Sequence, residues 1–390
     1  MNNGKIKIVT VLLMGLIGGC YSSNNYTPPP LPPGVQGYVP IDQFANDDRI
    51  PQVAFDGTNY LVVYEETLPG HDIIGALVSP SGAVLGGSSF FIDDSPNDDL
   101  APAVAFDGTN YLVVYQRMNT TDHEIIGTFV SLAGVPSAPF AIDNSPNDDL
   151  APAVAFDGTN YLVVYEETVS STDHNIIGAQ VSPAGVVLGG SPFAIDNSGN
   201  DDLTPKVTFG GGNYLAVYQE TVSSTDHNIV GALVSTAGSP GSPFAIDSSA
   251  NDDLAPAVAF DGTNYLAVYQ RTANPTNHDI IGAFVSSAGV PGPPSAIDNT
   301  TFDDLVPAIA FDGTNYLVVY QETLTSTNRD IIGTRVSPGG IVDPNVVLID
   351  TSGADDLVPA VAFGITNYLV AYEEIFSSTD HDIFGARVTP

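Results

Sequence analysis

The sequence predicts an all-β protein, a seven-bladed β-propeller whose blades are four-stranded antiparallel sheets. Three observations predict it. The chain repeats at a nearly fixed interval, each repeat contains four short strand-like segments, and the last repeat lacks one strand that appears ahead of the first repeat instead. No helical periodicity interrupts this pattern.

The repeat is marked by the triplet Asn-Tyr-Leu, which recurs every 50 to 53 residues. Its tyrosines are Tyr60, Tyr111, Tyr161, Tyr214, Tyr265, Tyr316 and Tyr368. A period of this length indicates a module that cannot bury its own faces and packs against its neighbours. The predicted repeats lie near 43–92, 93–142, 143–195, 196–246, 247–297, 298–349 and 350–390.

Four segments of the third repeat read as strands, since they are short and rich in Val, Ile, Phe and Tyr. They are "APAVAF" from Ala151, "YLVVYEE" from Tyr161, "NIIGAQVSP" from Asn175 and "SPFAID" from Ser191. The first two are joined by "DGTN", a tight-turn signal in which Gly supplies a positive φ. Four antiparallel strands in each of seven repeats are typical of propeller blades.

The two ends of the repeat region indicate a closed ring. The seventh repeat stops at "DIFGARVTP", Asp382 to Pro390, with no "FAID" strand after it. The missing strand is found at the other end as "YVPID", Tyr38 to Asp42. An open array has no use for a displaced strand, so residues 38–42 are predicted to complete the last blade of a domain spanning 38–390.

Several propeller signatures are missing from these repeats. The chain has no Trp, which WD40 repeats require. Over residues 38–390 it resembles the tandem "FDGTNYLVVY"-type repeats of bacterial surface lipoproteins. That resemblance implies the repeat architecture and no particular activity.

The first twenty residues resemble a bacterial lipoprotein precursor. Lys5 and Lys7 precede an apolar run that ends in "IGGC", and this run is shorter than the roughly 20 residues that a membrane-spanning helix needs. The resemblance implies a signal peptide at 1–19 and a lipid anchor on Cys20. Cys20 is the only cysteine, so the mature chain has neither an internal disulfide nor thiol catalysis.

A linker follows the predicted anchor. Residues 20–37 are rich in Pro, Ser and Asn and read as a semi-rigid stalk. Tyr21 follows the lipidated cysteine where Asp would signal retention in the inner membrane, and the lipoprotein resemblance then implies the outer membrane. The predicted location is the bacterial cell envelope, with membrane contact through the lipid only.

The composition limits the partners. The formal net charge is −36, which disfavours nucleic acid and anionic lipid as ligands. Hydrophobic residues make up 43% and charged residues only 14%, enough for a packed core. A protein or glycan ligand at the surface is expected.

An acidic motif joins each repeat to the next: Ile-Asp, a four-residue gap, then Asp-Asp. The residues between the Ile-Asp and the Asp-Asp are expected to form a loop between two blades. The Asp residues that flank these loops would then form a rim on one face. Three roles stay open: acceptance of backbone N–H bonds in turns, binding of Ca²⁺ as the one cofactor considered, and direct contact with a partner. The candidate rim residues are Asp47, Asp48, Asp98, Asp99, Asp148, Asp149, Asp201, Asp202, Asp252, Asp253, Asp303, Asp304, Asp355 and Asp356.

A ring of donors is predicted beside this rim, with one member just before the third strand of each repeat. Its members are His71, His123, His174, His227, His278, Arg329 and His381. Six histidines suggest a transition-metal site, but Arg329 cannot ligate a metal. Arg and His share the ability to donate to carboxylates, which favours pairing with the Asp residues.

Paired acidic or amide residues end the second strand of each repeat, as in Glu65-Glu66 and Glu373-Glu374. Two carboxyl groups at a suitable distance can hydrolyse a glycoside. An active site is asymmetric, however, and the repeats are near copies. Four residues differ in type from their equivalents in the other repeats: Arg49, Arg117, Lys206 and Arg271. Convergence of the three arginines in one pocket would favour an enzyme.

These observations favour a non-enzymatic, membrane-anchored surface module that presents seven near-equivalent acidic sites to a ligand. Its advantage would be avidity. Two alternatives stay open: a propeller glycoside hydrolase or lyase, and a calcium-stabilised structural or adhesion protein. No catalytic residue is assigned.

Overall fold

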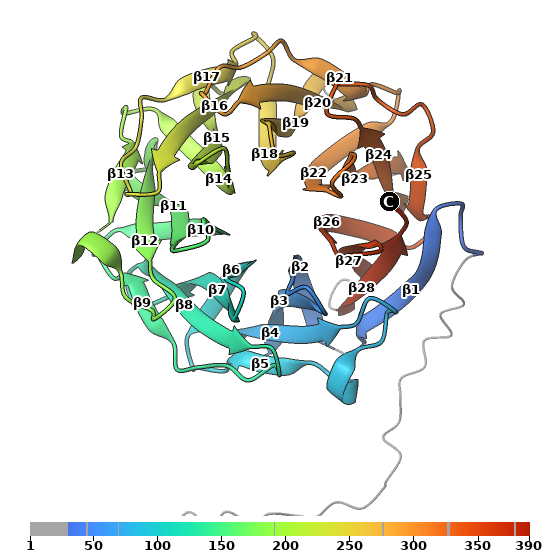
Figure 1. The fold of residues 1–390 in the computed structure, drawn as a ribbon, viewed down its shortest axis with the longest axis horizontal. Helices are drawn as coiled ribbons and strands as arrows, with labels where there is room; N and C mark the ends of the chain where they lie inside the picture. The colour runs from blue at the N-terminus through green and yellow to red at the C-terminus, as the bar shows by residue number, and fades with distance from the viewer. Residues whose placement is uncertain are drawn as a thin grey trace, which may run out of the picture.

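The computed structural model describes residues 30–43, 46–68, 70–190, 192–274, 277–325, 328–377 and 380–390. Their strands surround a central opening (Figure 1). The all-β prediction is confirmed, since the described residues contain strands and only two short 3₁₀ turns, η1 (Leu85–Gly87) and η2 (Leu188–Gly190). In this part of the chain, no helix has the length and apolar character to span a membrane. The predicted signal peptide, Cys20 and the linker up to residue 29 lie outside the described residues.

The strands form antiparallel groups of four, which run outward from the centre in chain order (Figure 1). The innermost strands are β2 (Asp47–Phe55), β6 (Asp98–Phe106), β10 (Asp148–Phe156), β14 (Asp201–Gly210), β18 (Asp253–Phe260), β22 (Asp303–Phe311) and β26 (Asp355–Phe363). The second strands are β3 (Tyr60–Leu68), β7 (Asn110–Met118), β11 (Tyr161–Ser170), β15 (Asn213–Ser223), β19 (Asn264–Asn274), β23 (Tyr316–Thr325) and β27 (Tyr368–Ser377).

The third and outermost strands complete each group. The third strands are β4 (Gly70–Val78), β8 (His123–Ser131), β12 (Asp173–Val181), β16 (Asp226–Ser235), β20 (Asn277–Ser286), β24 (Asn328–Val336) and β28 (Asp380–Val388). The outermost strands are β5 (Phe90–Asp93), β9 (Phe140–Asp143), β13 (Phe193–Asp196), β17 (Phe244–Asp247), β21 (Ser295–Asp298) and β25 (Val347–Asp350).

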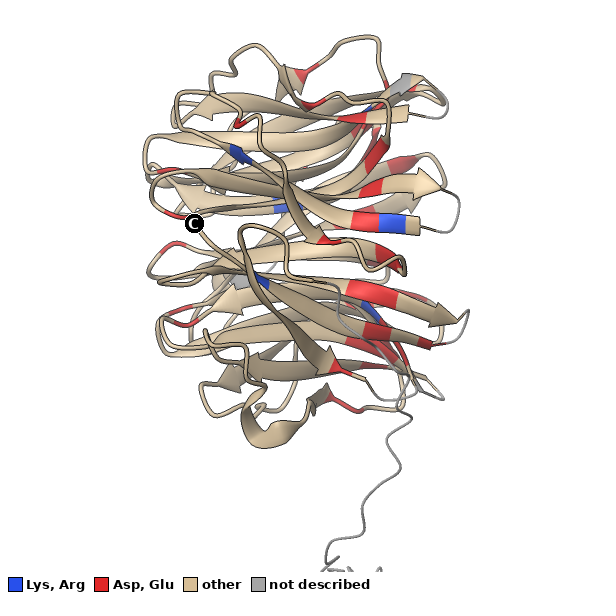
Figure 2. Ribbon diagram, turned by 90° about the vertical axis from the view of Figure 1, so that its right-hand side faces the viewer, with Lys and Arg blue, Asp and Glu red and all other residues tan. Residues whose placement is uncertain are grey.

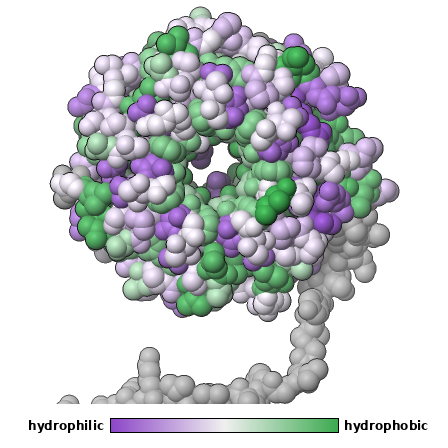
Figure 3. Space-filling model, in the orientation of Figure 1, coloured by the Kyte–Doolittle hydropathy of each residue, from purple (hydrophilic) through white to green (hydrophobic). Residues whose placement is uncertain are grey.

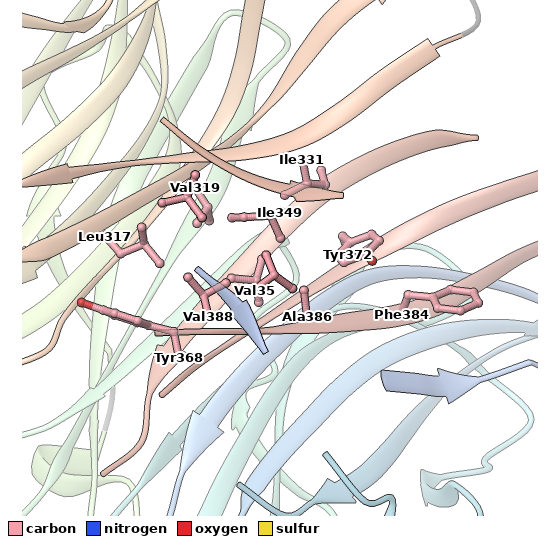
Figure 4. Close-up of a cluster of buried hydrophobic side chains, with 12 residues drawn as sticks. Val35, Leu317, Val319, Ile331, Ile349, Tyr368, Tyr372, Phe384, Ala386 and Val388 are labelled. Carbon is pink, nitrogen blue, oxygen red and sulfur yellow. The ribbon is translucent and has the colours of Figure 1, made fainter. Parts of the chain in front are cut away.

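The strand β1 (Val35–Asp42) pairs antiparallel with β28, from the other end of the chain. It begins at Val35, three residues before the predicted start, so the end of the predicted linker belongs to a strand. Val35 packs among Ile349, Tyr368 and Val388, residues more than 300 positions away (Figure 4).

The core lies between neighbouring sheets. In one cluster, Leu61 and Val63 of β3 pack against Tyr111 and Val113 of β7. Each sheet therefore buries both of its faces, and a strand buried on both faces has no polar alternation. This explains why the second strands carry the continuous apolar run "YLVVY", all of whose residues are fully buried in β3 and β11.

The acidic pairs lie in strands, which corrects the expectation that they belong to loops; the one exception is Asp252, which precedes β18 and forms an isolated bridge with His227. In β10, Asp148 lies opposite Thr168 and Asp149 lies opposite Glu167. The ladder is then interrupted between Leu150 and Ala153 before it resumes. The predicted strand began only at Ala151, because Asp is uncommon in strands and the interruption hides the pairing ahead of it.

A left-handed residue occupies that interruption in every inner strand. Seven non-glycine residues have φ between 46° and 52°: Ile50, Ala101, Ala151, Thr204, Ala255, Val306 and Val358. This conformation costs roughly 1–2 kcal/mol for a residue with a Cβ. It turns the backbone N–H of each residue toward the neighbouring sheet, where a side-chain oxygen accepts it.

The acceptors of these N–H groups are the first polar residues at the ends of the preceding second strands. Ala101 donates to Glu65 Oε2 at 3.1 Å and Ala151 donates to Gln116 Oε1 at 2.9 Å. The bonds continue with Thr204 to Glu166, Ala255 to Gln219, Val306 to Gln270, Val358 to Gln321 and Ile50 to Glu373. We call these acceptors the inner acceptor ring: Glu65, Gln116, Glu166, Gln219, Gln270, Gln321 and Glu373.

The tyrosines of the Asn-Tyr-Leu triplets bond across the sheets at the hairpin ends. Tyr111 OH donates to the carbonyl of Asn59 at 3.2 Å, and Tyr60 OH donates to that of Asn367 at 2.6 Å. The hydroxyls of Tyr161, Tyr214, Tyr265, Tyr316 and Tyr368 donate to the equivalent asparagine carbonyls. Each pair of neighbouring sheets is thus joined at both ends.

The left-handed positions provide a stability test. Ala255→Gly should raise the free energy of unfolding by up to about 1 kcal/mol, because glycine removes the left-handed cost and adds only about 0.5–1 kcal/mol of backbone entropy. Ala257→Gly is the matched control in the same strand without a positive φ, and it should destabilise by about 0.5–1 kcal/mol. Urea unfolding followed by circular dichroism measures both, and equal losses would contradict the prediction.

Candidate functional site

The acidic residues gather mainly toward one side of the molecule, the right-hand side of the view in Figure 2. The first Asp of each pair is half-buried and the second is fully buried, since neighbouring residues of a strand point to opposite sides. The two members of a pair therefore contact different groups.

The first Asp of each pair meets the donor ring of the preceding repeat. Nδ1 of His123 lies 2.7 Å from Asp148 Oδ1, and Nδ1 of His278 lies 2.6 Å from Asp303 Oδ1. Similar pairs join His174 to Asp201, His227 to Asp252, Arg329 to Asp355 and His381 to Asp47. His71 reaches Asp98 through its backbone N–H, at 3.0 Å. The donors thus contact carboxylates of the next sheet.

The second Asp of each pair lies in a buried polar cluster at the junction of two sheets. We call this cluster a junction site and define it by four residues. Three belong to one sheet or the motif leading into it: this second Asp, the Asp of the preceding Ile-Asp, and the second polar residue at the end of the second strand. The fourth is the residue that follows the donor-ring member of the preceding repeat. At the junction between the last and first repeats these are Asp48, Asp42, Glu66 and Asp382. The Ile-Asp carboxylate also accepts a bond from a buried tyrosine, as Asp42 Oδ2 does from Tyr64 OH at 2.5 Å.

Two junction sites contain a guanidinium. Arg117 Nε donates to Asp99 Oδ1 at 2.8 Å, and its NH2 group donates to Asp93. Arg271 makes the same bonds to Asp253 and Asp247. The remaining five sites have a glutamate in place of arginine: Glu66, Glu167, Glu220, Glu322 and Glu374.

The pKa values of the second Asp residues separate the two kinds of junction site. Burial and nearby carboxylates raise the pKa of Asp48 to about 10, of Asp304 to about 9, and of Asp149 to about 8. Burial also raises the pKa of Asp99 and Asp253, but only to about 6, because Arg117 and Arg271 favour the ionised forms.

The unusual residues do not converge. Arg117 and Arg271 lie in separate junction sites, and Arg49 pairs with Asp47 at 2.7 Å. The three arginines therefore do not meet in one pocket, and this particular argument for an enzyme is not supported. Among the described residues, no group of three or more His, Cys, Asp or Glu side chains is arranged as a metal-binding set.

The inner acceptor ring contains an asymmetry that the repeat pattern conceals. Four members are glutamine, and three are glutamate: Glu65, Glu166 and Glu373. Glu373 and Glu65 belong to the last and first repeats, whose strands β27 and β2 are in contact. Arg49 lies opposite Glu65 in the β2–β3 ladder, and the next residue, Ile50, donates its N–H to Glu373 Oε1 at 2.8 Å.

Arg49 is thus the ladder partner of Glu65 and the chain neighbour of the residue bonded to Glu373, and the charges of both glutamates act on it. Glu65 and Glu373 are only 5% and 4% exposed, and burial raises the pKa of each carboxyl. The charge of Glu373 further raises the pKa of Glu65. The pKa of Arg49 is raised chiefly by its bond to Asp47, and the charges of Glu373 and Glu65 raise it further. The sequence analysis did not predict the group of Glu65, Glu373 and Arg49, because it treated the repeats as equivalent. The exchange of Glu for Gln at this position between repeats could have indicated it.

A cavity of about 340 Å³ lies between the inner strands, in line with the central opening of Figure 3. Its lining is mostly Val, Ala and Pro, together with Ile50 and Gln52. Lys206 is the one ionisable residue among the described residues that line it. Desolvation lowers the pKa of Lys206, and the charge of Glu166 acts in the opposite direction.

Comparison with known proteins shows the fold. No protein-family model matches the sequence, and no curated protein matches it either. A protein of unknown function from Dyadobacter fermentans is similar in structure, with a TM-score of 0.59 and 10% identity over 92% of this chain and 99% of that one. A subtype N10 neuraminidase-like protein of a little yellow-shouldered bat isolate has a TM-score of 0.50 and 10% identity, over 91% of this chain and 99% of that one.

A puromycin-hydrolyzing peptidase of Mycobacterium tuberculosis is also similar, with a TM-score of 0.59 and 14% identity over 88% of this chain. The match spans 52% of the peptidase. These likenesses define a propeller-like all-β protein with tandem strand repeats.

The expectation of a non-enzymatic surface module is wrong. One similar structure, the puromycin-hydrolyzing peptidase, is a hydrolase, and the comparisons support the propeller hydrolase alternative better than a non-enzymatic role. The physical argument against an enzyme also fails, because it required seven equivalent repeats. Glutamates that act on each other and on Arg49 occur at one junction, so a set of near-copy repeats contains an asymmetric site.

The raised pKa values of the second Asp residues predict how stability depends on pH when cations are removed. Asp304 binds its proton more tightly in the folded state than in the unfolded chain, where its pKa is about 3.9. Between pH 5 and 8 the folded state then holds more protons, so unfolding free energy should fall as pH rises, by up to about 1.4 kcal/mol per pH unit for each such group.

Urea titrations in excess chelator at pH 5 and pH 8 measure this slope. Asp304→Asn should flatten it. Asp343→Asn is the control, because hydrogen bonds from Asn345 lower the pKa of Asp343 and keep that carboxylate ionised in both states over this range. A slope that is the same in the parent and in Asp304→Asn would contradict the assignment.

Proposed function

We propose that this protein is a glycoside hydrolase in which Glu65 and Glu373 form the catalytic carboxyl pair. One observation carries the proposal: at a single junction, the two buried glutamates act electrostatically on each other and on Arg49, while four of the other five inner acceptors are glutamines. Glycoside hydrolysis uses two carboxyl groups, one as an acid and the other as a nucleophile or base.

The surroundings of the pair suit this chemistry. Each glutamate is oriented by a backbone N–H, from Ala101 at Glu65 and from Ile50 at Glu373. Each hydrogen bond uses one carboxylate oxygen. Nδ1 of His381 lies 3.5 Å from the other oxygen of Glu373. A fixed carboxyl group beside a second one favours a proton on one of the two, which is the state that protonates a leaving group.

Arg49 links the pair to solvent. Its side chain is 41% exposed, whereas both glutamates are nearly buried. The charge of Arg49 favours the ionised form of both glutamates, against the larger effect of burial, and the guanidinium can bind a hydroxyl-bearing substrate at the surface. The strongly acidic surface repels polyanions, which supports a neutral glycan as substrate and hydrolysis rather than elimination from a uronate polymer.

We further propose that the repeats form seven blades closed by β1, and that the ring is anchored through Cys20 to the outer membrane. The pairing of β1 with β28 and the bonds from Ile50 to Glu373 and from Tyr60 to Asn367 support closure. The lipoprotein-like first twenty residues support the anchor. Such a location would give the site access to glycans of the envelope or its surroundings.

Removal of either catalytic carboxyl should abolish hydrolysis. Glu65→Gln and Glu373→Gln are each expected to lower kcat at least about 100-fold, since an amide replaces an acid or a nucleophile. Gln fills the same position in four other repeats and accepts the same backbone bond, so folding should be preserved. The assay is release of sugar from neutral oligosaccharides and aryl glycosides.

Glu166→Gln is the matched control, because Glu166 accepts the bond from Thr204 in another repeat, away from Arg49. Its activity should equal that of the parent. Hydrolysis that persists in both Glu65→Gln and Glu373→Gln, or a parent inactive on every glycoside, would reject the proposal.

The plot of hydrolytic activity against pH should be bell-shaped. On the acid side it falls when the ionised partner gains a proton, and on the alkaline side it falls when the acid loses its proton. Burial raises the pKa of both carboxyls above the usual 4.5, so the acid limb should lie above pH 4.5. Profiles of kcat/KM against pH measure this, and a rate that stays maximal at pH 4 would contradict it.

A further inference from the structure

The junction sites form two chemical classes within one chain. The second and fifth repeats supply Arg117 and Arg271, and the remaining five supply a glutamate at the same place in the ladder. Asp99 pairs with Arg117 across the sheet as Asp48 pairs with Glu66 and Asp356 with Glu374. The backbone is shared, so the difference lies in charge.

The arginine sites show where a cation belongs. Arg117 contacts Asp99 through both Nε and NH2, at 2.8 and 3.1 Å, and the same NH2 group contacts Asp93. Arg271 does the same between Asp253 and Asp247. One positive group thus fits between the second Asp and the Ile-Asp carboxylate of a junction.

The glutamate sites hold carboxylate oxygens without partners. Asp48, Asp304 and Asp356 have no exposed surface. In each of them, both carboxylate oxygens are buried and accept no hydrogen bond from the described residues. An orphaned buried carboxylate is costly, so repeated orphans at equivalent positions indicate a missing positive partner.

The neighbours of these three Asp residues supply further oxygens. Asp42, Glu66 and Asp382 act on Asp48, and Asp350, Glu374 and Asp330 act on Asp356. Around Asp304 the corresponding groups are Asp298, Glu322 and Asp279. All are hard oxygen donors, and no thiol or imidazole belongs to the sets.

Charge balance identifies the valence of the partner. Exchange of arginine for glutamate lowers the charge of a junction by two, and one divalent cation restores it. Calcium takes six to eight oxygen ligands in flexible geometry, which suits several carboxylates on separate strands. Carboxylates repel one another until a cation lies between them, and among the described residues no three of them are arranged as a metal-binding set.

We propose that Ca²⁺ binds at the five glutamate junctions, and that Arg117 and Arg271 are built-in substitutes for it at the other two. The ligands at the last-to-first junction are Asp42, Asp48, Glu66 and Asp382. The equivalent sets are centred on Asp149, Asp202, Asp304 and Asp356. The sites join neighbouring sheets, so bound Ca²⁺ stabilises the ring independently of any catalysis by Glu65 and Glu373.

The experiment counts ions on the chelator-stripped protein. Equilibrium dialysis against Ca²⁺ followed by elemental analysis should give five ions per chain. Tb³⁺ provides a second readout, because Tyr64, Tyr165, Tyr218 and Tyr320 donate to the Ile-Asp carboxylates and can sensitise its luminescence. Excess Ca²⁺ should abolish that emission and raise Tm.

Two reciprocal variants tie the count to the junctions. Glu322→Arg copies the arginine arrangement and should lower the count to four, whereas Arg117→Glu copies the glutamate arrangement and should raise it to six. Asp343→Asn, in the loop between β24 and β25, should leave five. Arg117→Glu keeps the test valid if Glu322→Arg does not fold.

Three results would overturn the proposal. One is absence of Ca²⁺ and Tb³⁺ binding, which would mean that the buried carboxyls are simply protonated. Another is a count that does not follow the two reciprocal variants, which would mean diffuse binding to an acidic surface. The third is loss of an ion in Asp343→Asn with no loss in Glu322→Arg.

Discussion

One interaction recurs at every junction and the rest of the structure depends on it: a side-chain oxygen at the end of a second strand accepts the N–H of a left-handed residue in the next sheet. Ala151 and Gln116 make this bond at 2.9 Å. The left-handed turn is unfavourable for alanine or valine alone, and the intersheet bond with the surrounding packing offsets its cost. In each inner strand the bond lies where the antiparallel ladder is interrupted, as between Leu150 and Ala153 of β10.

Function follows from small departures from that rule. Glutamine and glutamate accept the same backbone bond at equivalent positions, so exchange between them preserves the fold. At Glu65 and Glu373 the exchange places two carboxyls near Arg49, and in the proposed function these two structural acceptors are also the catalytic groups. The junction sites follow the same logic, since Arg117 replaces a glutamate without altering the strand pairing. A repeat fold can thus vary one position at a time and keep its architecture.

Sequence patterns predicted the strands well where burial decides them. "YLVVY" and "DGTN" fix the second strands and their hairpins, because continuous apolar runs and Asp-Gly turns have few alternatives. The sequence patterns did not predict the strand residues at the Asp pairs. Local propensity disfavours Asp there, and only cross-strand partners such as Glu167 and the donors of the neighbouring sheet make the strand continue. The donor ring was placed beside the correct carboxylates since both recur with one period.

The sequence by itself determined the repeat, the strand order and the acidic character of one face, because these follow from periodicity and alternation along the chain. Tertiary structure alone decided which polar groups meet. Ile50 and Glu373 are 323 positions apart, and no local pattern relates them. It also decided that the second Asp of each pair is buried beside the preceding Ile-Asp, where solvent cannot screen it. Contact between repeats depends on the packing of sheets, and that packing turns near-identical repeats into unequal sites.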